Sequence, residues 1–557
     1  MASSVSKRAI FFVAAALPYA LEILTPGHLY QASKWQTAIV AFLAIFIPRF
    51  IWLSIIYPFY FSPLRHLPQP KQNSLLFGQM YRILTESIGS PQSQWMREIP
   101  NDGLIYYRTL FNTEWLVLTS PKALSDALTT KSYDLIKPPI IVGSLARILG
   151  ASGILLVENE EHKHQRKNLL PAFQYRHIKN LYPLFWNKAR DMISAIDREL
   201  SEKKKKSEGS VPPNIVSVDH WTSRATLDII GLAGIGQSFN AIEDETNELY
   251  QSYQTIFAQD RQARILGVLN TFFPFWLVRK LPFPRNYQIV KAQSMLQKMC
   301  LDLIGQKRAN SAAADKEGSR EIVDDIDILG IALKSGGFSD QGIIDQLMTF
   351  LAAGHETTAT AMTWAMLALC KHPNVHNKLR EELRAAKLPN IRDTESQIFA
   401  EQIDQIAYLQ AVMNEVLRVY TPVPATFRVA QRDTTICSQF VPKGTMVLTS
   451  SVGTNHLSTL WGDDCDEFNP ERWLDESGRA NTSGGAESNY ANMTFSHGPR
   501  GCIGASFAKG EFACLLAAWV LAYDSVLVDE NMKVEKTPGI VSRIKDGLDV
   551  KLTSLKA

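Results

Sequence analysis

The chain has 557 residues, of which 46% are hydrophobic and 20% are charged, a composition typical of a globular protein with some extra apolar content. Its formal net charge of +3 is too small to attract a polyanion, so nucleic-acid binding is excluded as a function class. Six cysteines occur without CxxC pairs or regular spacing. This pattern indicates neither a disulfide framework nor a zinc site and favours a reducing compartment.

Two apolar stretches lie near the N-terminus. Residues 9–24 follow two basic residues, and residues 35–61 are long enough to cross a bilayer but contain Arg49 near their middle. We predict a membrane anchor within residues 1–61, with one span or two. Because a charge at bilayer depth is costly, the alternative for the second stretch is a bend at Pro48 and a partly interfacial position. A cleaved signal peptide fits poorly, since no small-residue cleavage site follows the first stretch.

A proline-rich, basic linker follows at residues 62–71. Proline fixes φ, so the linker is expected to hold the next domain at a set distance and tilt, on the cytosolic side. Beyond it, helical periodicity dominates, with short strands at 115–120 and 445–452. We predict one large domain over residues 62–557, mainly α with a minor β-sheet region (α+β). Three polar stretches are expected to be surface loops: residues 201–210, 310–321 and 476–489.

Residues 339–369 are predicted to form one long helix whose middle reads AAGHETT. Gly354 weakens the helix, and Thr357 and Thr358 can bond to preceding carbonyls. Glu356 places a carboxyl group in an otherwise apolar run. We expect a local opening that admits a water beside an acid and a hydroxyl, which suits proton delivery. The alternative is an ordinary helix turn with a surface acid.

The stretch FSHGPRGCIG carries the strongest signal of chemistry. A helical pattern begins just after Cys502, so the helix dipole is expected to lower the pKa of its thiol. Gly498 and Gly504 would let a planar group approach the backbone, and Arg500 adds a cation. This set suits an iron porphyrin with acidic propionates. The alternatives are a small buried thiol and a nucleophile with His497 as its base.

This stretch resembles the haem-binding loop F-x-x-G-x-R-x-C-x-G of the cytochrome P-450 superfamily at all five fixed positions. Residues 353–358 are similar to the family's oxygen-binding motif [AG]-G-x-[DE]-T-[ST]. Glu415 and Arg418, three apart on a predicted helix, match its E-x-x-R motif, and Arg472 lies in the later loop FNPERW. Alone, the first pair would be a surface ion pair of little worth, whereas the resemblance implies a buried structural network.

The resemblance assigns roles to single residues. Cys502 would be the axial thiolate ligand of haem b (iron protoporphyrin IX), Arg500 a propionate ligand, and Phe495 a packing residue near the sulfur. Thr357 would hold dioxygen, and Glu356 would supply protons to the reaction.

Three further propionate contacts are implied. Arg166 lies in a stretch similar to the family's W-x-x-x-R helix, with His162 where tryptophan is commoner. A histidine can still donate to a propionate, and Arg428 falls where the family has another propionate arginine. The substrate pocket would be lined mostly by apolar or small residues: the loop before His162, Met348, Leu351, Ala352, and residues 423–426 and 539–541.

The resemblance implies a eukaryotic microsomal monooxygenase of the fungal secondary-metabolism type. It would insert one atom of O2 into a hydrophobic small molecule, by hydroxylation, epoxidation or multistep oxidation. The chain is too short for a fused reductase, so electrons would come from a separate NADPH-cytochrome reductase. We expect anchoring in the lipid of the endoplasmic reticulum with the catalytic domain in the cytosol. The alternatives are a haem-thiolate isomerase or dehydratase, which does not need the Glu356–Thr357 pair, and a non-catalytic haem-binding protein.

Overall fold

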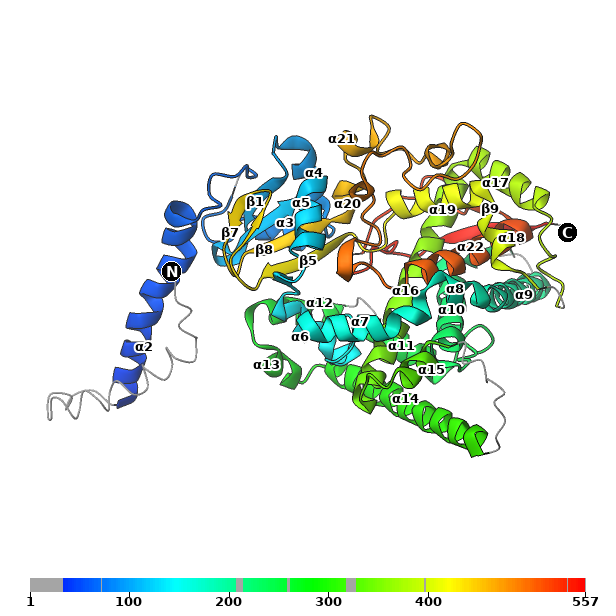
Figure 1. Ribbon diagram of the computed structural model, residues 1–557, viewed down its shortest axis with the longest axis horizontal. Coiled ribbons are helices and arrows are strands. Elements are labelled where there is room, and N and C mark those ends of the chain that lie inside the picture. Colours follow the sequence, from blue (N-terminus) through cyan, green and yellow to red (C-terminus); the bar gives the residue numbers. More distant parts are fainter. Residues whose placement is uncertain are drawn as a thin grey trace.

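The structure is a computed structural model that describes residues 34–71, 73–206, 214–257, 261–316, 327–394, 397–537 and 539–555. Helices make up most of the body, and the largest sheet lies at the end from which the N-terminal helix projects (Figure 1). The prediction of a mainly helical fold with a minor sheet region is confirmed.

The helices of the first half are α2 (Lys34–Ile51), η1 (Trp52–Phe61), α3 (Met80–Thr85), α4 (Ser90–Glu98), η2 (Leu110–Asn112), α5 (Pro121–Ser125), η3 (Asp126–Thr130), α6 (Pro139–Leu149), α7 (Asn159–Phe173), α8 (Tyr175–Ile178), η4 (Lys179–Leu181), α9 (Tyr182–Lys206), α10 (Val218–Ile230), η5 (Gly231–Ile235), α11 (Glu248–Phe257) and α12 (Arg261–Phe272). Those of the second half are α13 (Phe275–Lys280), α14 (Pro284–Lys316), α15 (Ile328–Ser335), α16 (Asp340–Lys371), α17 (Pro373–Ala385), α18 (Ala400–Asp404), α19 (Ala407–Val419), α20 (Ser451–Thr454), α21 (Ser458–Trp461), η6 (Pro470–Trp473), η7 (Asn489–Ala491), η8 (Gly498–Arg500) and α22 (Ala505–Ala522).

The strands are β1 (Leu104–Arg108), β2 (Glu114–Leu118), β3 (Leu135–Ile136), β4 (Ile215–Ser217), β5 (Ala425–Ala430), β6 (Thr434–Ile436), β7 (Gln439–Val441), β8 (Met446–Ser450), β9 (Tyr523–Leu527) and β10 (Asp549–Ser554). Within the described residues they form a five-stranded sheet of order β1-β2-β8-β5-β3, a three-stranded sheet β4-β10-β9 and the hairpin β6-β7. In the largest sheet only β2 and β8 pair in parallel.

The largest sheet is buried on both faces because alternate side chains of a strand point to opposite sides. Leu104 and Tyr106 belong to one apolar cluster, whereas Ile105 and Tyr107 belong to another. Strand β5, which carries Arg428, is thereby fixed between β8 and β3.

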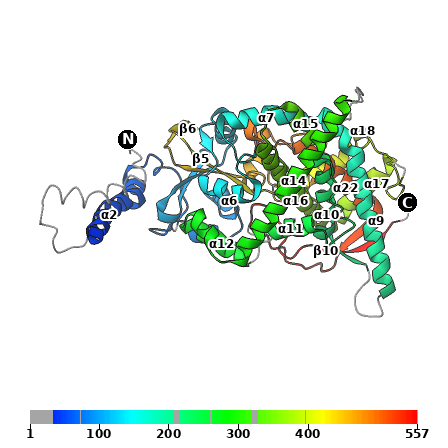
Figure 2. The same cartoon turned by 90° about the horizontal axis from the view of Figure 1, so that it is seen from below.

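The core of the helical body is built around α16, which packs against α10, α14, α19 and α22 (Figure 2). Ser339 caps its N-terminus, since its hydroxyl accepts a hydrogen bond from the Gly342 N–H at 3.1 Å. Helix α22 is apolar all round and mostly buried, as expected of a core helix.

Two of the three predicted surface loops are wrong in part. Helix α9 continues to Lys206 and helix α14 to Lys316, so residues 201–206 and 310–316 are helical. The lysine-rich run was interpreted as a loop from its polarity, but lysine and glutamate are good helix formers. Lys203 also contacts Glu199, one turn earlier, at 2.5 Å.

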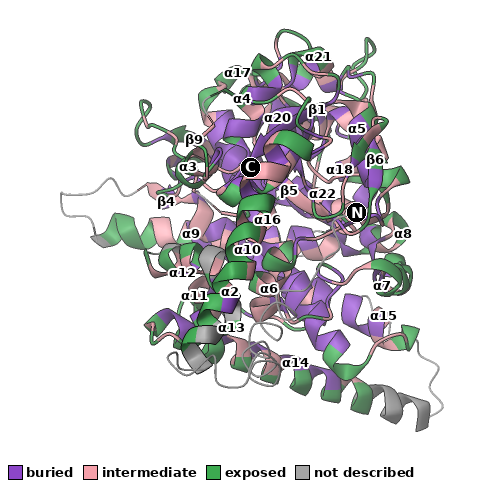
Figure 3. Cartoon of the chain, turned by 90° about the vertical axis from the view of Figure 1, so that its left-hand side faces the viewer, coloured by how far each residue is buried: buried purple, intermediate pink, exposed green. Residues whose placement is uncertain are grey.

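The apolar segment at the N-terminus forms α2 and its continuation η1, and the helix runs through Pro48 without a break. Residues 39–61 have a mean hydropathy of 2.4 and are long enough to cross a bilayer, and most of their side chains are exposed (Figure 3). The stretch at residues 9–24 lies outside the described residues.

The end of this helix is docked onto the body by specific contacts. The Asn112 side-chain amide donates to the Ser54 carbonyl at 2.6 Å, and the rings of Phe50 and Phe111 meet edge to face at 5.2 Å. The Arg108 guanidinium lies over a third ring, that of Phe59. Both Phe111 and Asn112 have a positive φ, so the backbone of η2 adopts a strained turn to present these side chains.

Candidate active site

Cys502 lies in a short segment between η8 and the N-terminal cap of α22 at Gly504, as its position in the sequence predicted. Its backbone N–H donates to the Phe495 carbonyl at 2.8 Å, which closes the loop. From the opposite side, Arg166 of α7 donates to the Gly501 carbonyl at 2.8 Å. The cysteine is therefore held by its own loop and by a distant helix.

The two glycines of this loop differ in their reason for being glycine. Gly498 has φ +74°, and a Cβ there would overlap the carbonyl oxygen of Leu128 in η3. The interpretation that Gly498 leaves room for a planar group is therefore wrong, because protein backbone fills that space. A Cβ on Gly504 would meet only the ring of Phe173, at 3.8 Å, so space remains on this side of the loop.

Cys502 is a free, exposed thiol, yet burial raises its pKa. Protein surrounds the sulfur while part of its surface stays accessible, a combination typical of a side chain that borders an internal space. The Gly504 N–H and Arg166 act to lower the pKa but do not outweigh burial. The predicted lowering is therefore wrong for the chain alone. A metal ion at the sulfur would reverse the sign, because a coordinating thiol is deprotonated outright.

A group of basic side chains surrounds the cysteine loop, each from a different segment: Lys137 before α6, His162 and Arg166 on α7, Arg428 on β5 and Arg500 in η8. Within the described residues, one carboxylate, Glu158, interacts with this group. It forms ion pairs with Lys137 at 3.2 Å and with Arg500. Positive charge is therefore in excess.

Arg500 is the least satisfied member of the group. Its side chain is 4% exposed, and its three guanidinium nitrogens lack hydrogen-bond acceptors among the described residues, although the head group contacts Glu158. Its other neighbour is the Tyr133 ring, 4.8 Å away. A buried guanidinium without acceptors is costly, so this site favours an acidic ligand.

The neighbouring cations also experience this excess of charge. Burial, with Arg500 nearby, lowers the pKa of Arg428 to about 10. Burial likewise lowers the pKa of Lys137 to about 8, with Arg428 and Arg500 contributing and Glu158 opposing. An anion placed among these groups would raise both pKa values again and would be held by charge-assisted hydrogen bonds.

His162 is buried, and its Nδ1 lies 3.3 Å from the Tyr133 hydroxyl. Burial lowers its pKa to about 4, helped by Arg500, Lys137 and Arg166. The imidazole is therefore neutral at physiological pH. If the Tyr133 hydroxyl donates to Nδ1, the ring proton lies on Nε2, which can donate one hydrogen bond to an acidic group.

Helix α16 carries the predicted acid and hydroxyl. The Thr357 hydroxyl donates to the Ala353 carbonyl at 2.8 Å, as predicted, whereas Thr358 Oγ1 has no hydrogen-bond partner among the described residues. The helix continues through this turn, so the expected opening does not appear as a break. Gly354 is required for packing, because a Cβ there would lie 2.8 Å from the Ile230 side chain of α10.

The predicted pocket lining is only partly correct. Met348 and Leu351 are fully buried and pack within the core, so neither side chain borders an open space. On the same helix Ala352 is half-buried and Ala353 is exposed, although this helix is otherwise buried over most of its length. The accessible part of α16 at this level is therefore formed by small apolar residues.

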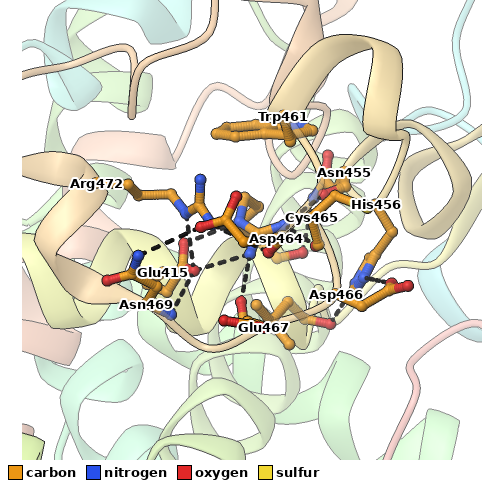
Figure 4. Close-up of polar contacts among 12 residues, drawn as sticks. Glu415, Asn455, His456, Trp461, Asp464, Cys465, Asp466, Glu467, Asn469 and Arg472 are labelled. Atoms are coloured by element: carbon orange, nitrogen blue, oxygen red, sulfur yellow. Dashed lines mark hydrogen bonds and ion pairs between the residues drawn. The ribbon is translucent and has the colours of Figure 1, made fainter.

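A buried ionic network supports the cysteine loop (Figure 4). The Glu415 carboxylate accepts hydrogen bonds from five donors, which come from Arg418, Asn469, Arg472 and Trp473. Arg418 donates its remaining N–H groups to the carbonyls of three residues: Asn455, Cys465 and Glu467. The predicted burial of Glu415, Arg418 and Arg472 in one network is confirmed.

Asn455 connects this network to the cysteine loop. Its side-chain oxygen accepts from the Met493 N–H at 2.8 Å, and its amide donates to the Thr494 hydroxyl at 3.0 Å. Thr494 in turn donates to the Leu417 carbonyl of α19 at 2.8 Å. The residues directly before Phe495 are thus fixed to the helix that carries the ion pair.

Comparison with known proteins identifies the family. A model of the family described as Cytochrome P450 matches residues 68–551. The chain belongs to the cytochrome P450 family. It is 42% identical over 537 residues to cytochrome P450 monooxygenase sphH of Aspergillus fumigatus, covering 95% of this chain and 96% of that one. It is 40% identical over 575 residues to cytochrome P450 monooxygenase FUM15 of Gibberella moniliformis, covering 95% and 94%.

A third relative is cytochrome P450 monooxygenase ALT8 of Alternaria alternata, 39% identical over 551 residues and covering 90% of this chain and 92% of that one. Members of this family bind haem through a cysteine thiolate, and the chain is a haem-thiolate monooxygenase. It inserts one atom of O2 into a small-molecule substrate with electrons from a redox partner. The excess of buried positive charge and the accessible Cys502 sulfur fit a cofactor with two acidic side chains.

Sequence reasoning missed several residues of this site. Lys137, Glu158 and Tyr133 belong to the basic group, and Asn455 links the network to the loop. Each lies outside the recognised motifs and is brought to the site only by folding. The preference of Pro138 and Pro139 for non-helical backbone after Lys137 was the sole local signal near them, and it names no ligand.

Replacing Glu415 by Gln tests the network. The change leaves the Arg418 charge buried without its counter-ion, so we expect a loss of about 3–5 kcal/mol in the free energy of unfolding and poorer haem retention. Denaturant unfolding followed by circular dichroism measures the first effect, and haem absorbance per protein measures the second.

The matched control is Glu471→Gln in the same region, which breaks the exposed Lys378–Glu471 pair and should cost about 0–1 kcal/mol. Equal losses in the two variants would contradict a special role for the buried network.

Proposed function

We propose that this enzyme binds haem b with Cys502 as the axial thiolate ligand and with its propionates held by Arg166, Arg428, Arg500 and the Nε2–H of His162. The observation that carries this proposal is the buried Arg500 guanidinium, whose nitrogens lack acceptors beside a free and accessible thiol. Phe495 anchors the loop through its carbonyl, which accepts from the Cys502 N–H.

When bound, haem supplies the activation of O2, in the overall reaction RH + O2 + NADPH + H⁺ → ROH + H2O + NADP⁺. The residues of α16 handle the protons that this reaction consumes. Glu356 is buried, which raises the pKa of its carboxyl group although Arg543 opposes the rise. A carboxyl group with a raised pKa can both hold and release a proton near neutral pH, and the Thr357 hydroxyl lies next to it on the helix.

We further propose a hydrophobic substrate, as in fungal secondary metabolism. Small and apolar residues, such as Ala352, Ala353 and Val423, are the partly or fully accessible ones near the predicted pocket. Electrons would come from a membrane-bound NADPH-cytochrome reductase. Glu356 and Thr357 favour monooxygenation over a haem-thiolate isomerase, dehydratase or non-catalytic haem carrier, because only oxygen reduction consumes protons at this position.

We also propose that residues 1–61 anchor the enzyme in the lipid of the endoplasmic reticulum, with residues 62–557 as one catalytic domain in the cytosol. The exposed apolar helix at residues 39–61 supports the anchor. The contacts of Asn112 and Phe111 with this helix would fix the tilt of the domain on the membrane, so a substrate dissolved in lipid could reach it directly.

Replacing Cys502 by Ala tests the ligand. We expect the reduced carbon monoxide complex to lose its thiolate-type absorption spectrum, because no other sulfur would take this place. Cys370→Ala, which removes a thiol that contacts the Ser525 carbonyl, should leave the spectrum unchanged. A thiolate-type spectrum in the Cys502→Ala variant would refute the assignment.

Replacing Thr357 by Ala tests the proton relay. Loss of the hydroxyl should divert electrons to the reaction O2 + NADPH + H⁺ → H2O2 + NADP⁺, so peroxide released per NADPH should rise several-fold in the presence of reductase. Thr349→Ala is the matched control, since its hydroxyl makes the same kind of bond on the same helix, to the Asp345 carbonyl at 2.8 Å. An unchanged peroxide yield in Thr357→Ala would count against the relay.

Deleting residues 1–61 tests the anchor. The full chain should float with phosphatidylcholine vesicles in a density gradient, and the truncated chain should stay in the dense fraction. Asn112→Ala, which removes a docking contact but keeps the apolar helix, should still float. Flotation of the truncated chain to the same extent would show that the membrane contact lies elsewhere.

A further inference from the structure

A cavity of about 540 Å³ lies beside α16, between α10, α11 and the segment that connects β9 to β10. Its wall includes polar side chains that readily bind water, among them Ser223, Tyr250, Gln254 and Thr360. A liquid water occupies about 30 Å³, so the cavity can hold on the order of a dozen waters. We call it the polar chamber.

Glu356 is part of the chamber wall, and its carboxylate is paired there with Arg543. The Glu356 side chain is 12% exposed and that of Arg543 36%, so the acid is more deeply placed than the cation. The backbone of Arg543 is fixed, since its carbonyl accepts from the Thr537 N–H at 2.9 Å. The cation therefore holds the carboxylate at the chamber side of α16.

The other charged groups around the chamber are engaged elsewhere. From α10, the Asp219 carboxylate accepts from the Leu548 N–H at 2.9 Å, and His220 lies 2.8 Å from Arg224. From the connecting segment, Lys545 pairs with Glu535 at 2.6 Å.

On α16 itself, His355 Nε2 lies 3.1 Å from the Ser223 hydroxyl, and burial followed by Arg543 lowers the pKa of this histidine to about 3. It is therefore neutral. On α11, Tyr250 is buried, which raises the pKa of its phenol, so it too is neutral at physiological pH. Among the described residues, Arg543 is thus the charged group that sets the charge of Glu356.

From this geometry we infer that the polar chamber is the entry for protons to the reaction, and that Arg543 is a positioning residue that holds the Glu356 carboxylate toward it. A proton passes from chamber water to Glu356, then toward the Thr357 hydroxyl, and water exchange with solvent replaces it. The inference rests on the proposed relay through Glu356 and Thr357. It adds an element of control: the pH at which Glu356 can accept and release a proton is set by a residue of the C-terminal segment.

The sign of the pH dependence follows from the ion pair. Burial raises the pKa of Glu356, and Arg543 lowers it again by favouring the charged form. Without the guanidinium, the carboxyl group stays protonated to a higher pH. The upper pH limit of a reaction that uses this acid as donor must then move upward as well.

The test uses the full-length holoenzyme and two readouts. The first is the infrared band of the protonated Glu356 carboxyl group, identified by its loss in Glu356→Gln and titrated against pH. In Arg543→Gln its midpoint should rise by about 1 to 3 pH units, as expected when a carboxylate loses an adjacent cation. Arg543→Lys should restore part of the shift, and it also replaces the first variant if that one folds poorly.

The second readout is the pH at which the peroxide yield per NADPH increases in the presence of reductase. In Arg543→Gln this pH should rise by the same interval as the infrared midpoint. Lys545→Gln is the matched control, because it removes a cation of the same segment that pairs with Glu535. Both readouts should be unchanged in that variant.

An unchanged infrared midpoint in Arg543→Gln would overturn the positioning role. A shifted midpoint with an unchanged peroxide profile would overturn proton entry at this carboxylate. Equal effects in Lys545→Gln would assign the result to chamber charge in general and refute a specific role for Arg543. If the holoenzyme consumes no NADPH, the proposed monooxygenase function fails, while the infrared readout still decides whether Arg543 sets the charge of Glu356.

Discussion

The cysteine loop is surrounded by more buried positive charge than the described part of the chain neutralises. Arg500 has no hydrogen-bond acceptor for its guanidinium, and Glu158 is the carboxylate that it shares with Lys137. Such an arrangement opposes folding unless an acidic group completes it. The free energy released when the acidic cofactor binds therefore contributes to the stability of this region, and the two cannot be separated.

The loop itself is rigid before any ligand is considered. The backbone of η3 fills the space beside Gly498, Arg166 binds the Gly501 carbonyl, and Asn455 holds the residues just before Phe495. These supports come from three distant segments. The buried network behind Asn455 matters for the same reason, because it gives the loop a fixed frame without taking part in the chemistry.

Much of the site could be predicted from the sequence because its parts are short motifs on regular helices. Residues 339–369 were predicted as one helix, and the structure has it from Asp340 to Lys371. The prediction failed where burial decides. The thiol of Cys502 has a raised pKa because protein surrounds it, and Met348 faces the core. The polar run at 201–206 became helix because exposed lysines are compatible with one.

The sequence by itself determined what depends on spacing along the chain: the thiol placed just before α22, the three-residue interval between Glu415 and Arg418, and the acid next to Thr357. Helix geometry fixes these relations within a few residues. Only the tertiary structure decided which charges meet, such as Arg543 with Glu356, and on which side of α16 they meet. Such contacts join segments far apart in the sequence, and their energies depend on burial, which no local pattern records.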